Sequence, residues 1–518
     1  MPEHLRALIV ILGLASAVFA YVQRPAFDLP IDPADLRRRR NLWFVVTVIA
    51  FLSHNFWIYV AGVAAVLLAQ RKHEPNPLAM YLMLLFAVPP FSAVIAGIGP
   101  IDQLFGLNHL RLMSLAILLP TWYTIRKSRT HGPFGYCWAD RFLLAYLLYQ
   151  AGLNLSAGNF TNGLRQGVLY GFTDVFLPYF VASRGLRSMP EMRDALASLA
   201  VAGFVLSGIA LFEFLKHWLL YAELDSALGV SFHMGSYVGR GDLGVVRASA
   251  SVGHGIALGY VLAIASLLYL ALAPSPGKAF SRWTGSGILT VGLLVALSRG
   301  PWVGMAIGVV VFAAMSAHRL RDLSRILVWG GVFFGLVLVS PYGEKLLNLL
   351  PFVGTTDAFN VDYRRRLLEA SILVIQQHPL FGGGDYVGGL AAQGLVQGEG
   401  IVDIVNTYLA VALSQGLVGL GLFVGIFVAA GIGLLTARRQ AGQDQGMRRL
   451  GSALLAALVA ALVIISSMSP ILCVPTAYWL LAGLCVAYTR LPKPSTGGAL
   501  PVNKAFHSFT PVGHPVPM

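Results

Sequence analysis

The residues of this chain whose types and spacing could do chemistry are concentrated between positions 341 and 403. This segment contains three consecutive arginines, Arg364 to Arg366, the glycine-rich run HPLFGGG at 378–384, and an acidic residue, Asp403. Long apolar stretches lie on both sides of it. Charged residues set among membrane-spanning segments are costly and mark pathways or sites. The segment therefore predicts a membrane-embedded active site.

Arginine is the side chain that we expect to bind the substrate. A guanidinium binds phosphate through two parallel hydrogen bonds and stays protonated at physiological pH. At about 100° per residue, a helix over 364–377 places Arg364 near the centre of its apolar arc, so we expect Arg364 to be buried beneath the helix against an anion. We expect Arg365 and Arg366 to be solvated or bound to lipid headgroups. The natural anion at a membrane surface is a lipid phosphate or diphosphate, and a diphosphate leaves readily once its developing charge is neutralised.

A further arginine, Arg299, lies in the sequence SRGP at 298–301, between two short apolar segments. Glycine and proline at such a bend can expose backbone N–H groups and a guanidinium at membrane depth, where non-helical backbone must be buried in protein or line a cavity. We therefore expect Arg299 to be functional. Arg247 precedes another apolar segment and is either an interface anchor or a ligand contact. His254, about two turns later, is either a packed polar residue or a base.

The polar residues after the predicted helix have structural and functional interpretations. His378 and Pro379 end the helix, and Gly382 to Gly384 either form a turn or let the backbone approach a ligand closely. Asp403 either caps the helix that begins near residue 405 or takes a proton from an attacking hydroxyl group. No cluster of carboxylates with metal-ligand spacing accompanies the arginines, so we expect neither a metal ion nor a cofactor.

The composition indicates that membrane helices position these residues. Of 518 residues, 56% are hydrophobic and 12% are charged, and the mean hydropathy is +0.70. We predict an all-α, polytopic transmembrane bundle of about 12–14 spans. Segments 42–69 and 405–436 are each either one tilted helix or a tight pair. The candidate spans are 5–21, 42–69, 78–98, 110–125, 141–157, 165–182, 195–217, 250–273, 284–298, 301–317, 326–340, 405–436, 450–468 and 470–488.

The placement of charge predicts which loops share a face of the membrane. The net charge of +14 is carried by short basic loops, so we expect no nucleic-acid partner. The positive-inside rule puts these loops in the cytoplasm and 341–403 on the opposite face. Arg37 to Arg40 fit this scheme only if 42–69 crosses twice or the N-terminus lies outside. The basic loops are those that contain Arg71 and Lys72; Arg126, Lys127 and Arg129; Arg184, Arg187 and Arg193; Arg319, Arg321 and Arg325; and Arg438, Arg439, Arg448 and Arg449.

Several classes of protein are disfavoured by what the sequence lacks. The three cysteines form no CxxC pair, which argues against a disulfide framework and against a thiolate metal site. The chain contains no Walker loop, no GxGxxG after a strand and no HExxH, so nucleotide-driven and zincin chemistry have no support.

The order of the motifs resembles that of the O-antigen ligase and Wzy-type polysaccharide polymerase superfamily of bacterial inner membranes. Residues 298–300 (SRG) are similar to the SRG of that family. Residues 364–370 (RRRLLEA) and 378–384 (HPLFGGG) resemble its R-x-x-L-W-x-A…P-L-x-G-x-G, and 406–420 (NTYLAVALSQGLVGL) resembles its H-N-x-Y-L…G-L-x-G-L. Residues 247–259 (RASASVGHGIALG) also resemble the family. The resemblance covers about residues 240–435.

This resemblance implies a GT-C-like bundle with a periplasmic loop that contains an amphipathic helix and lies over the site. It also implies a glycan donor on undecaprenyl diphosphate, with no nucleotide sugar and no required metal. By matched position, Arg299 and Arg364 bind the diphosphate. The histidine that commonly precedes the family's asparagine is Val405 here; Asp403 or His378 could replace it, and we favour Asp403 as the catalytic base. The further substrate-binding residues predicted are Arg247, His254, Arg365, His378, Gly382, Gly384, Asn406 and Tyr408.

The sequence therefore predicts a metal-independent glycosyltransferase of the inner membrane. It would join a lipid-linked oligosaccharide to a hydroxyl acceptor, a glycan or lipid A-core, at the periplasmic face during surface or exopolysaccharide assembly. A Wzy-type polymerase is favoured over an O-antigen ligase or a protein O-oligosaccharyltransferase, because Val405 replaces the usual histidine. A transporter or flippase of lipid-linked glycan is the alternative from another class. The predicted regions are an N-terminal bundle (1–240), a catalytic region (241–436), C-terminal helices (437–490) and a disordered cytoplasmic tail (491–518).

Overall fold

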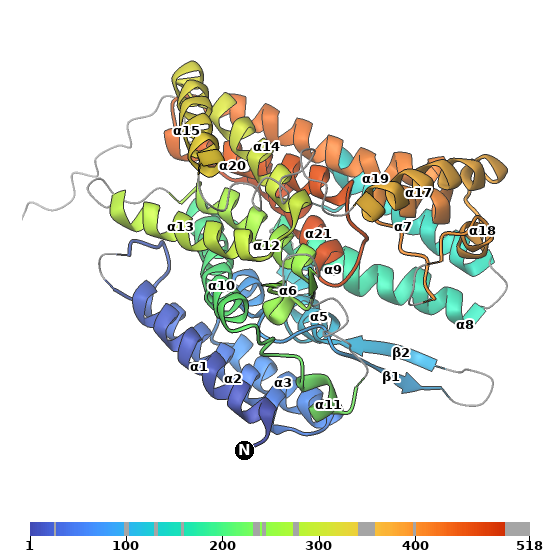
Figure 1. Ribbon diagram of the computed structural model, residues 1–518, viewed down its shortest axis with the longest axis horizontal. Coiled ribbons are helices and arrows are strands. Elements are labelled where there is room, and N and C mark those ends of the chain that lie inside the picture. The colour runs from blue at the N-terminus through green and yellow to red at the C-terminus, as the bar shows by residue number, and fades with distance from the viewer. Residues whose placement is uncertain are drawn as a thin grey trace, which may run out of the picture.

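The computed structural model describes residues 1–24, 27–97, 103–128, 133–156, 160–230, 239–240, 245–272, 279–339, 358–396 and 400–492. This part of the chain is a bundle of helices with two small hairpins (Figure 1). By length and composition, the helices in it that could cross a membrane are α1 (Glu3–Val22), α10 (Met189–Lys216), α19 (Thr407–Gln440) and α20 (Gln445–Ile465). The predicted all-α membrane fold is confirmed, whereas the number of spans and the GT-C-like arrangement stay predictions.

The remaining elements pack against these four helices and against one another, with α14 along α20, α7 along α19 and α9 along α21. Two π-helical stretches, Ser114–Leu118 and Leu164–Phe176, continue into α6 and α9. The hairpins pair β1 (Ser92–Ala96) with β2 (Gln103–Asn108), and β3 (Gly239–Arg240) with β4 (Val245–Val246). The other helices are α2 (Pro33–Leu52), α3 (Phe56–Arg71), α4 (Pro77–Leu84), α5 (His109–Met113), α6 (Leu119–Ser128), α7 (Trp138–Ser156), α8 (Phe160–Gly163), α9 (Leu177–Arg184), α11 (Leu224–Leu228), α12 (Gly255–Tyr269), α13 (Ala279–Val295), α14 (Arg299–Ala314), α15 (Arg319–Val339), α17 (Ala358–Gln377), α18 (Tyr386–Ala392) and α21 (Val474–Arg490).

The predicted span 42–69 is a pair of helices, α2 and α3, separated by a turn at 53–55. The turn is stable because the Asn55 carboxamide oxygen accepts from the backbone N–H of Trp57 at 2.8 Å and so caps α3. In the same turn, His54 has a left-handed backbone with φ 48°. The His4 ring lies 5.4 Å from the His54 ring, so the first helix begins at the end of the bundle where this turn lies.

Arg37 to Arg40 lie at the other end of α2. Arg39 is fully buried, and its guanidinium donates to Glu74 and to Asp194, each at 2.6 Å. These ion pairs join the start of α2 to the loop before α4 and to the start of α10. The four arginines therefore share an end of the bundle with the basic loop at Arg71. The predicted scheme required either that 42–69 cross twice or that the N-terminus lie outside for Arg37 to Arg40 to join the other basic loops. The turn between α2 and α3 and the position of the N-terminus at the other end of the bundle both agree with that requirement.

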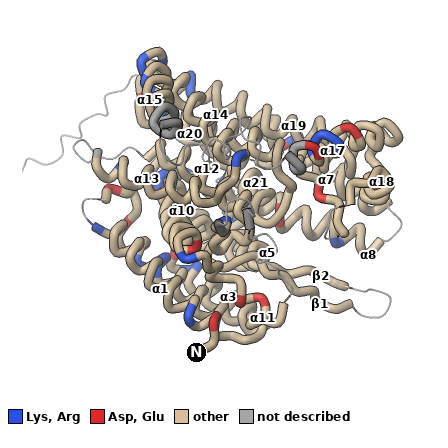
Figure 2. Tube along the Cα trace, viewed as in Figure 1, with Lys and Arg blue, Asp and Glu red and all other residues tan. Residues whose placement is uncertain are grey.

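The other basic loops gather at the same end, which we call the basic end and define by Arg39, Arg184, Arg438 and Arg449. The Arg184 side chain pairs with Asp140 at the start of α7. Nε of Arg449 donates to the carbonyl oxygen of the residue after α12 at 2.7 Å, and Arg438 donates to the carbonyl oxygen of the residue after α14. Figure 2 shows the charged positions along the bundle, with a further group on α17 at the opposite end. That opposite end is called the site end below.

The span predicted at 78–98 is wrong beyond Leu84. The chain leaves α4 there and continues without regular structure, still buried, into the hairpin of β1 and β2. Pro89 and Pro90 provide no backbone N–H donor to extend the helix. The carbonyl oxygens released at Leu84 and Phe86 are satisfied by the side chains of His109, at 3.3 Å, and Ser251. Buried protein partners thus replace the helical hydrogen bonds, as non-helical backbone among membrane helices requires.

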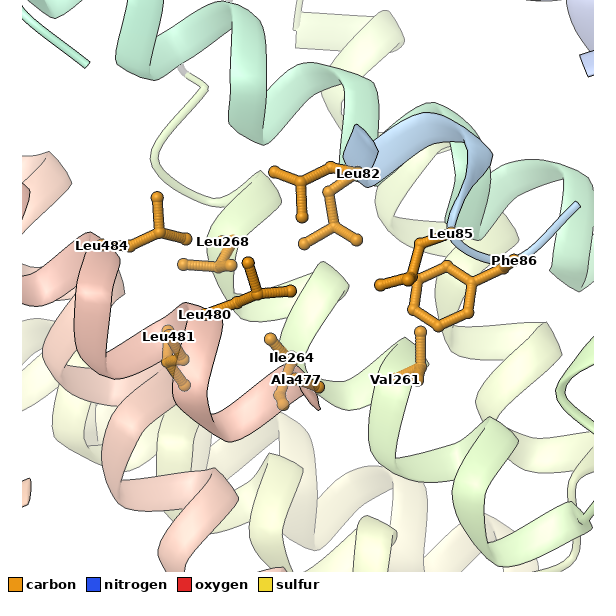
Figure 3. Close-up of a pocket in the computed structure, with 11 residues that line it drawn as sticks. Leu82, Leu85, Phe86, Val261, Ile264, Leu268, Ala477, Leu480, Leu481 and Leu484 are labelled. Atoms are coloured by element: carbon orange, nitrogen blue, oxygen red, sulfur yellow. The ribbon is translucent and has the colours of Figure 1, made fainter. Parts of the chain in front are cut away.

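A small cavity lies beside this break, between α4, α10, α12 and α21 (Figure 3). Its volume is about 30 Å³, and its lining is entirely apolar, with Leu82 and Phe86 on one side and Leu480 on the other. A cavity of this kind offers no polar partner to a water molecule or to a charged ligand. It is a packing void of the core and not a candidate for the predicted site.

The segment at 358–396 forms a separate small core at the site end (Figure 1). Tyr363, Leu367 and Val374 of α17 pack there against Leu390 of α18 and Leu413 of α19. The predicted helix in this segment is therefore present as α17, and it has one buried face. The first part of the predicted loop, 341–357, and the predicted disorder of the tail at 493–518 lie outside the described residues.

Candidate active site

Arg364 and the backbone next to Arg299 meet at the turn that follows α20. The backbone carbonyl oxygen of Ser467 accepts from Nη2 of Arg364 at 3.5 Å. A methyl group placed on Gly300 would lie 2.6 Å from the hydroxyl oxygen of the same serine. The Arg299-Gly300 backbone and the Arg364 guanidinium, far apart in the sequence, thus lie against one residue at the site end.

Asp403 is held at the same turn. Its carboxylate accepts from the Ser469 hydroxyl at 2.6 Å, and its backbone carbonyl oxygen accepts from the Tyr363 hydroxyl at 2.9 Å. Tyr363 precedes Arg364 in α17, and Ser469 follows Ser467 by two residues. The turn 466–469 therefore contacts Arg364, Asp403 and Gly300, the residue that follows Arg299, although its own serines are absent from the sequence prediction.

Three helices begin near this turn. α14 begins at Arg299 and α12 begins at Gly255, and a methyl group on Gly259 would lie 2.9 Å from the Pro301 ring. α19 begins at Thr407, whose hydroxyl donates to the Met468 carbonyl oxygen at 2.8 Å. Helix N-termini carry partial positive charge and bind phosphate groups in many proteins, and α14 begins without a side-chain cap. The backbone thus adds to the positive charge supplied by the arginines.

Arg247 and His254 lie on the α12 side of this region. A methyl group on Gly255 would be 3.4 Å from Nε of Arg247 and 3.0 Å from the carbonyl oxygen of Ala296. Nδ1 of His254 accepts from the backbone N–H of Ile256 at 3.1 Å and so caps α12. Burial, and then the charge of Arg247, lower the pKa of His254 to about 4. The ring is neutral at pH 7, and because Nδ1 accepts, Nε2 carries the proton.

Glu213 fixes the segment that carries Arg247, and the sequence prediction did not include it. Its carboxylate is fully buried near the end of α10. It accepts from three backbone N–H groups, those of Leu220 at 3.1 Å, Ser249 at 3.0 Å and Ala250 at 2.8 Å. The sequence could have indicated Glu213 as a candidate, because an acidic residue inside an apolar span is costly unless it has partners.

Left-handed backbone at residues other than glycine recurs around the site. Ala250 has φ 45°, Leu297 has φ 46° and Leu472 has φ 52°. These residues lie next to the Glu213 contact, next to Ser298-Arg299 and shortly after the 466–469 turn. Each left-handed residue costs about 1 kcal/mol, and such strain is retained where the surrounding structure imposes it, often at functional sites.

The predicted burial of Arg364 is wrong. The face of α17 that packs on the protein contains Tyr363, Leu367 and Val374, whereas Arg364 is exposed and shares its stripe with Leu368, which is 47% exposed. The buried face is centred about one residue earlier than the apolar arc suggested, which is a rotation of about 100°. Arg364 thus lies at the edge of the packed face, where a ligand from outside the bundle can reach it.

The neighbouring arginines form ion pairs within α17. Nε of Arg365 lies 3.1 Å from the Glu369 carboxylate, and Nε of Arg366 lies 3.0 Å from the Asp362 carboxylate. All four side chains are about half exposed or more. Exposed pairs one helical turn apart contribute little stability. The predicted role of Arg365 in substrate binding remains a prediction.

His378, Gly382 and Gly384 lie at the far end of α17, about 20 Å from Arg364 along the helix. Gly382 has φ 76°, and a methyl group on it would lie 2.7 Å from the Leu413 carbonyl oxygen. The structure therefore places Gly382 against the backbone of α19 and does not bring these three residues to the turn at 466–469. Gly384 differs, because a methyl group on it would meet nothing within 4 Å.

This glycine-rich turn docks at a break in α19. Gly416 has φ 67° and ψ −173°, which interrupts the helix. The Leu417 N–H donates to the Pro379 carbonyl oxygen at 2.8 Å, and the Tyr149 hydroxyl donates to the carbonyl oxygens of Leu380 and Gln415 at 3.1 and 2.8 Å. The two motifs at 378–384 and 406–420 are thus in direct contact. The backbone at 379–381 lies against the break in α19 at Gly416.

The remaining predicted residues occupy structural positions in α19. The Asn406 carboxamide oxygen accepts from the N–H groups of Tyr408 and Leu409 at 2.9 and 3.2 Å and caps the helix. The Tyr408 hydroxyl donates to the Leu462 carbonyl oxygen at 2.9 Å and links α19 to α20. Within the described residues, no group of three or more His, Cys, Asp or Glu side chains is placed to hold a metal ion.

Comparison with known families finds a similarity over the part of the chain that contains Arg299, Arg364 and Asp403. Residues 284–424 match the family model described as O-antigen ligase. The match begins in α13, ends in α19 and includes Arg299, Arg364 and Asp403. A search of curated proteins gave no matching relative. Residues 284–424 are therefore similar to an O-antigen ligase domain, and the resemblance of the sequence to the O-antigen ligase and Wzy-type superfamily is confirmed.

Proposed function

We propose that this protein is a glycosyltransferase that joins an oligosaccharide carried on undecaprenyl diphosphate to a hydroxyl acceptor at the periplasmic face of the inner membrane. The family match supports a membrane glycan ligase or polymerase. The observation that carries the proposal is the convergence of Arg364 and Gly300 on Ser467, with Asp403 bonded to Ser469. It brings cationic groups and a carboxylate to one turn, which is what displacement of a diphosphate from a sugar requires.

In this proposal the acceptor hydroxyl oxygen attacks the anomeric carbon of the donor sugar. A new carbon–oxygen bond forms there, and the bond from that carbon to the diphosphate oxygen breaks, with the electron pair leaving on the lipid diphosphate. Asp403 orients the acceptor and takes its proton. Arg299, Arg364 and the helix N-termini stabilise the negative charge that develops on the leaving group. A single direct displacement inverts the configuration at the anomeric carbon.

The proposed face of the membrane follows from the two ends of the bundle. Arg39, Arg184, Arg438 and Arg449 lie at the basic end, with α17 and Asp403 at the other. The positive-inside rule assigns the basic end to the cytoplasm, so the site opens towards the periplasm. We favour a polymerase over a ligase acting on lipid A-core or on protein, because Val405 stands where the family commonly has histidine.

The test is transfer by the purified protein in detergent, supplied with a lipid-diphosphate-linked glycan and no ATP. Lengthened glycan would support a polymerase, and transfer to lipid A-core would support a ligase. Arg364→Lys should lose most of the activity, because an ammonium group cannot reproduce the two parallel hydrogen bonds of a guanidinium. Arg366→Lys is the matched control, since it changes an exposed, ion-paired arginine of the same helix.

Asp403→Asn tests the proposed base, and we expect turnover to fall by about 10²–10⁴-fold. Asp385→Asn is its control, because Asp385 caps α18 in the same region and asparagine caps helices equally well. Full turnover by Arg364→Lys or Asp403→Asn would refute the assigned roles. Movement of an unaltered lipid-linked glycan across a vesicle membrane, with no transfer, would favour a transporter instead.

A further inference from the structure

Two arginines, Arg282 and Arg449, lie together at the basic end, remote from the candidate active site. Arg282 is near the start of α13 and Arg449 is near the start of α20, and α12 packs against both helices. Nε of Arg449 donates to the carbonyl oxygen of Leu270, directly after α12, at 2.7 Å. The Tyr269 hydroxyl donates to the carbonyl oxygen of Ser281, the neighbour of Arg282, at 3.2 Å. These hydrogen bonds bring both arginines to the same end of α12.

The charge of this pair is not offset by a carboxylate among the described residues. Arg449 is partly buried, and the charged side chain that acts on its guanidinium is Arg282. Arg282 is also partly buried, and its guanidinium lies 5.6 Å from the centre of the Trp283 ring. The carbonyl oxygens at the end of α12 carry only a partial negative charge. Two like charges that are partly withdrawn from water therefore repel each other, which is costly without an anionic partner.

The two guanidinium groups keep donors that a ligand can reach. Leu270 occupies Nε of Arg449, whereas Nη1 and Nη2 of Arg449 have no acceptor among the described residues. Neither these atoms nor the side-chain nitrogen atoms of Arg282 belong to the enclosed polar atoms without a partner, so they are accessible from outside. Phosphate oxygens accept several charge-assisted hydrogen bonds and match such a pair of guanidinium groups.

Exposed aromatic residues beside the pair indicate that it lies at the depth of lipid headgroups. Phe280 is 73% exposed and Trp283 is 69% exposed, and both belong to the first turns of α13. Large exposed rings are costly in water, and tryptophan is enriched where a membrane protein meets the headgroup layer. A phospholipid can therefore approach the two arginines from the side of α13.

We propose that Arg282 and Arg449 bind the phosphate group of an anionic phospholipid, with the lipid beside Phe280 and Trp283. The phosphate accepts hydrogen bonds from both guanidinium groups and offsets their mutual repulsion. Basic pockets between helices on the cytoplasmic side of a membrane are suited to such headgroups. The site is distinct from the proposed diphosphate site, which lies at the opposite end of the bundle, and it does not depend on the proposed transferase activity.

The experiment measures the melting temperature of the full-length protein in detergent micelles as lipid is added. We expect phosphatidylglycerol to raise the melting temperature in a saturable way, because it binds the folded protein. Phosphatidylcholine and inorganic phosphate should have little effect. Arg282→Gln should raise the phosphatidylglycerol concentration for half-maximal stabilisation about fivefold, which is the contribution of one arginine near an anionic membrane surface.

A second measurement separates binding from a structural role of Arg282. In detergent without phospholipid, Arg282→Gln should melt at the same temperature as the wild type or at a higher one. The reason is that it removes one of two like charges, while the Arg282 side chain makes no hydrogen bond among the described residues. Arg37→Gln is the matched control, because Arg37 is an exposed arginine of the basic end on another helix, α2. It should leave the response to phosphatidylglycerol unchanged.

Four outcomes would overturn the proposal. Equal stabilisation by phosphatidylcholine would show that any lipid has this effect. Equal stabilisation by inorganic phosphate at the same concentration would identify a site for a free anion. An unchanged half-maximal concentration in Arg282→Gln would remove that arginine from the site. A lower melting temperature of Arg282→Gln without phospholipid would show that the arginine stabilises the fold itself. The assay uses no glycan substrate, so failure of the proposed transferase activity cannot account for any of these results.

Discussion

The α-carbon of Gly300 faces the side chain of Ser467 so closely that a methyl group added to it would lie 2.6 Å from the serine hydroxyl oxygen. The same methyl group would lie 3.9 Å from the serine β-carbon, an ordinary contact distance. Gly300 follows Arg299, and Ser467 provides the carbonyl oxygen that accepts from Arg364. Ser467 therefore lies between Arg364 and the backbone that carries Arg299.

The contact predicts a compensating pair of substitutions. Gly300→Ala should lower transfer activity about tenfold, because the Ser467 hydroxyl must move and the turn that orients Arg364 moves with it. Ser467→Ala removes the clashing oxygen, so the double variant should recover most of the loss. The measurement is the initial rate of transfer by the wild type, both single variants and the double variant. Equal rates in Gly300→Ala and the wild type would show that the contact does not matter.

Glu213 provides a prediction about positioning. Glu213→Gln keeps the size of the side chain but replaces one acceptor oxygen by a donor, which then faces a backbone N–H. We expect a loss of about 1–3 kcal/mol in the free energy of unfolding and a higher KM for the lipid-linked donor, because Arg247 is less well held. Thermal unfolding and substrate titration measure the two effects. Glu223→Gln, at an exposed position, is the control, and a wild-type KM in Glu213→Gln would contradict the positioning role.

The break in α19 predicts a difference between two glycines of one helix. At Gly416, with φ 67° and ψ −173°, an added methyl group would lie 2.2 Å from the Leu380 carbonyl oxygen. Gly416→Ala should therefore destabilise the protein by more than about 2 kcal/mol and release the 378–384 turn. Gly421→Ala meets nothing within 4 Å and should be neutral or stabilising by up to about 1 kcal/mol. Thermal unfolding and limited proteolysis at 378–384 compare the two variants. A similar stability for both would show that the contact between the 378–384 turn and the break in α19 contributes little.

His254 predicts the pH dependence of stability at the start of α12. Its pKa is about 4 in the folded protein and about 6.5 when unfolded. Between these values the unfolded chain binds more protons, so stability falls as the pH decreases from 6.5 towards 4 and is unaffected by this group above 6.5. His254→Asn keeps a capping side chain without this titration. Its melting temperature should change less between pH 6.5 and 4 than that of the wild type, and identical pH profiles would exclude the assigned pKa.

The sequence alone determined features that depend on local patterns. The length and apolarity of the segments predicted the helices, and the basic loops predicted which helix ends lie together, as the contacts of Arg39 and Arg184 confirm. The ordered motifs around Arg299 and Arg364 predicted the similarity to an O-antigen ligase domain over residues 284–424. These properties can be read from a stretch of neighbouring residues, because hydrophobic periodicity and charge placement act over one or two helical turns.

The tertiary structure decided which distant residues meet. No local pattern places Ser467 against Gly300, or Glu213 beneath Ser249, because those contacts follow from the packing of helices far apart in the chain. The face of α17 was assigned about one residue out of register, since an apolar arc does not specify which part of it packs on protein and which remains exposed. The lack of a side chain at Gly382 likewise allows close approach either of a ligand or of neighbouring backbone. Only the position of α19 shows that protein occupies the space beside it.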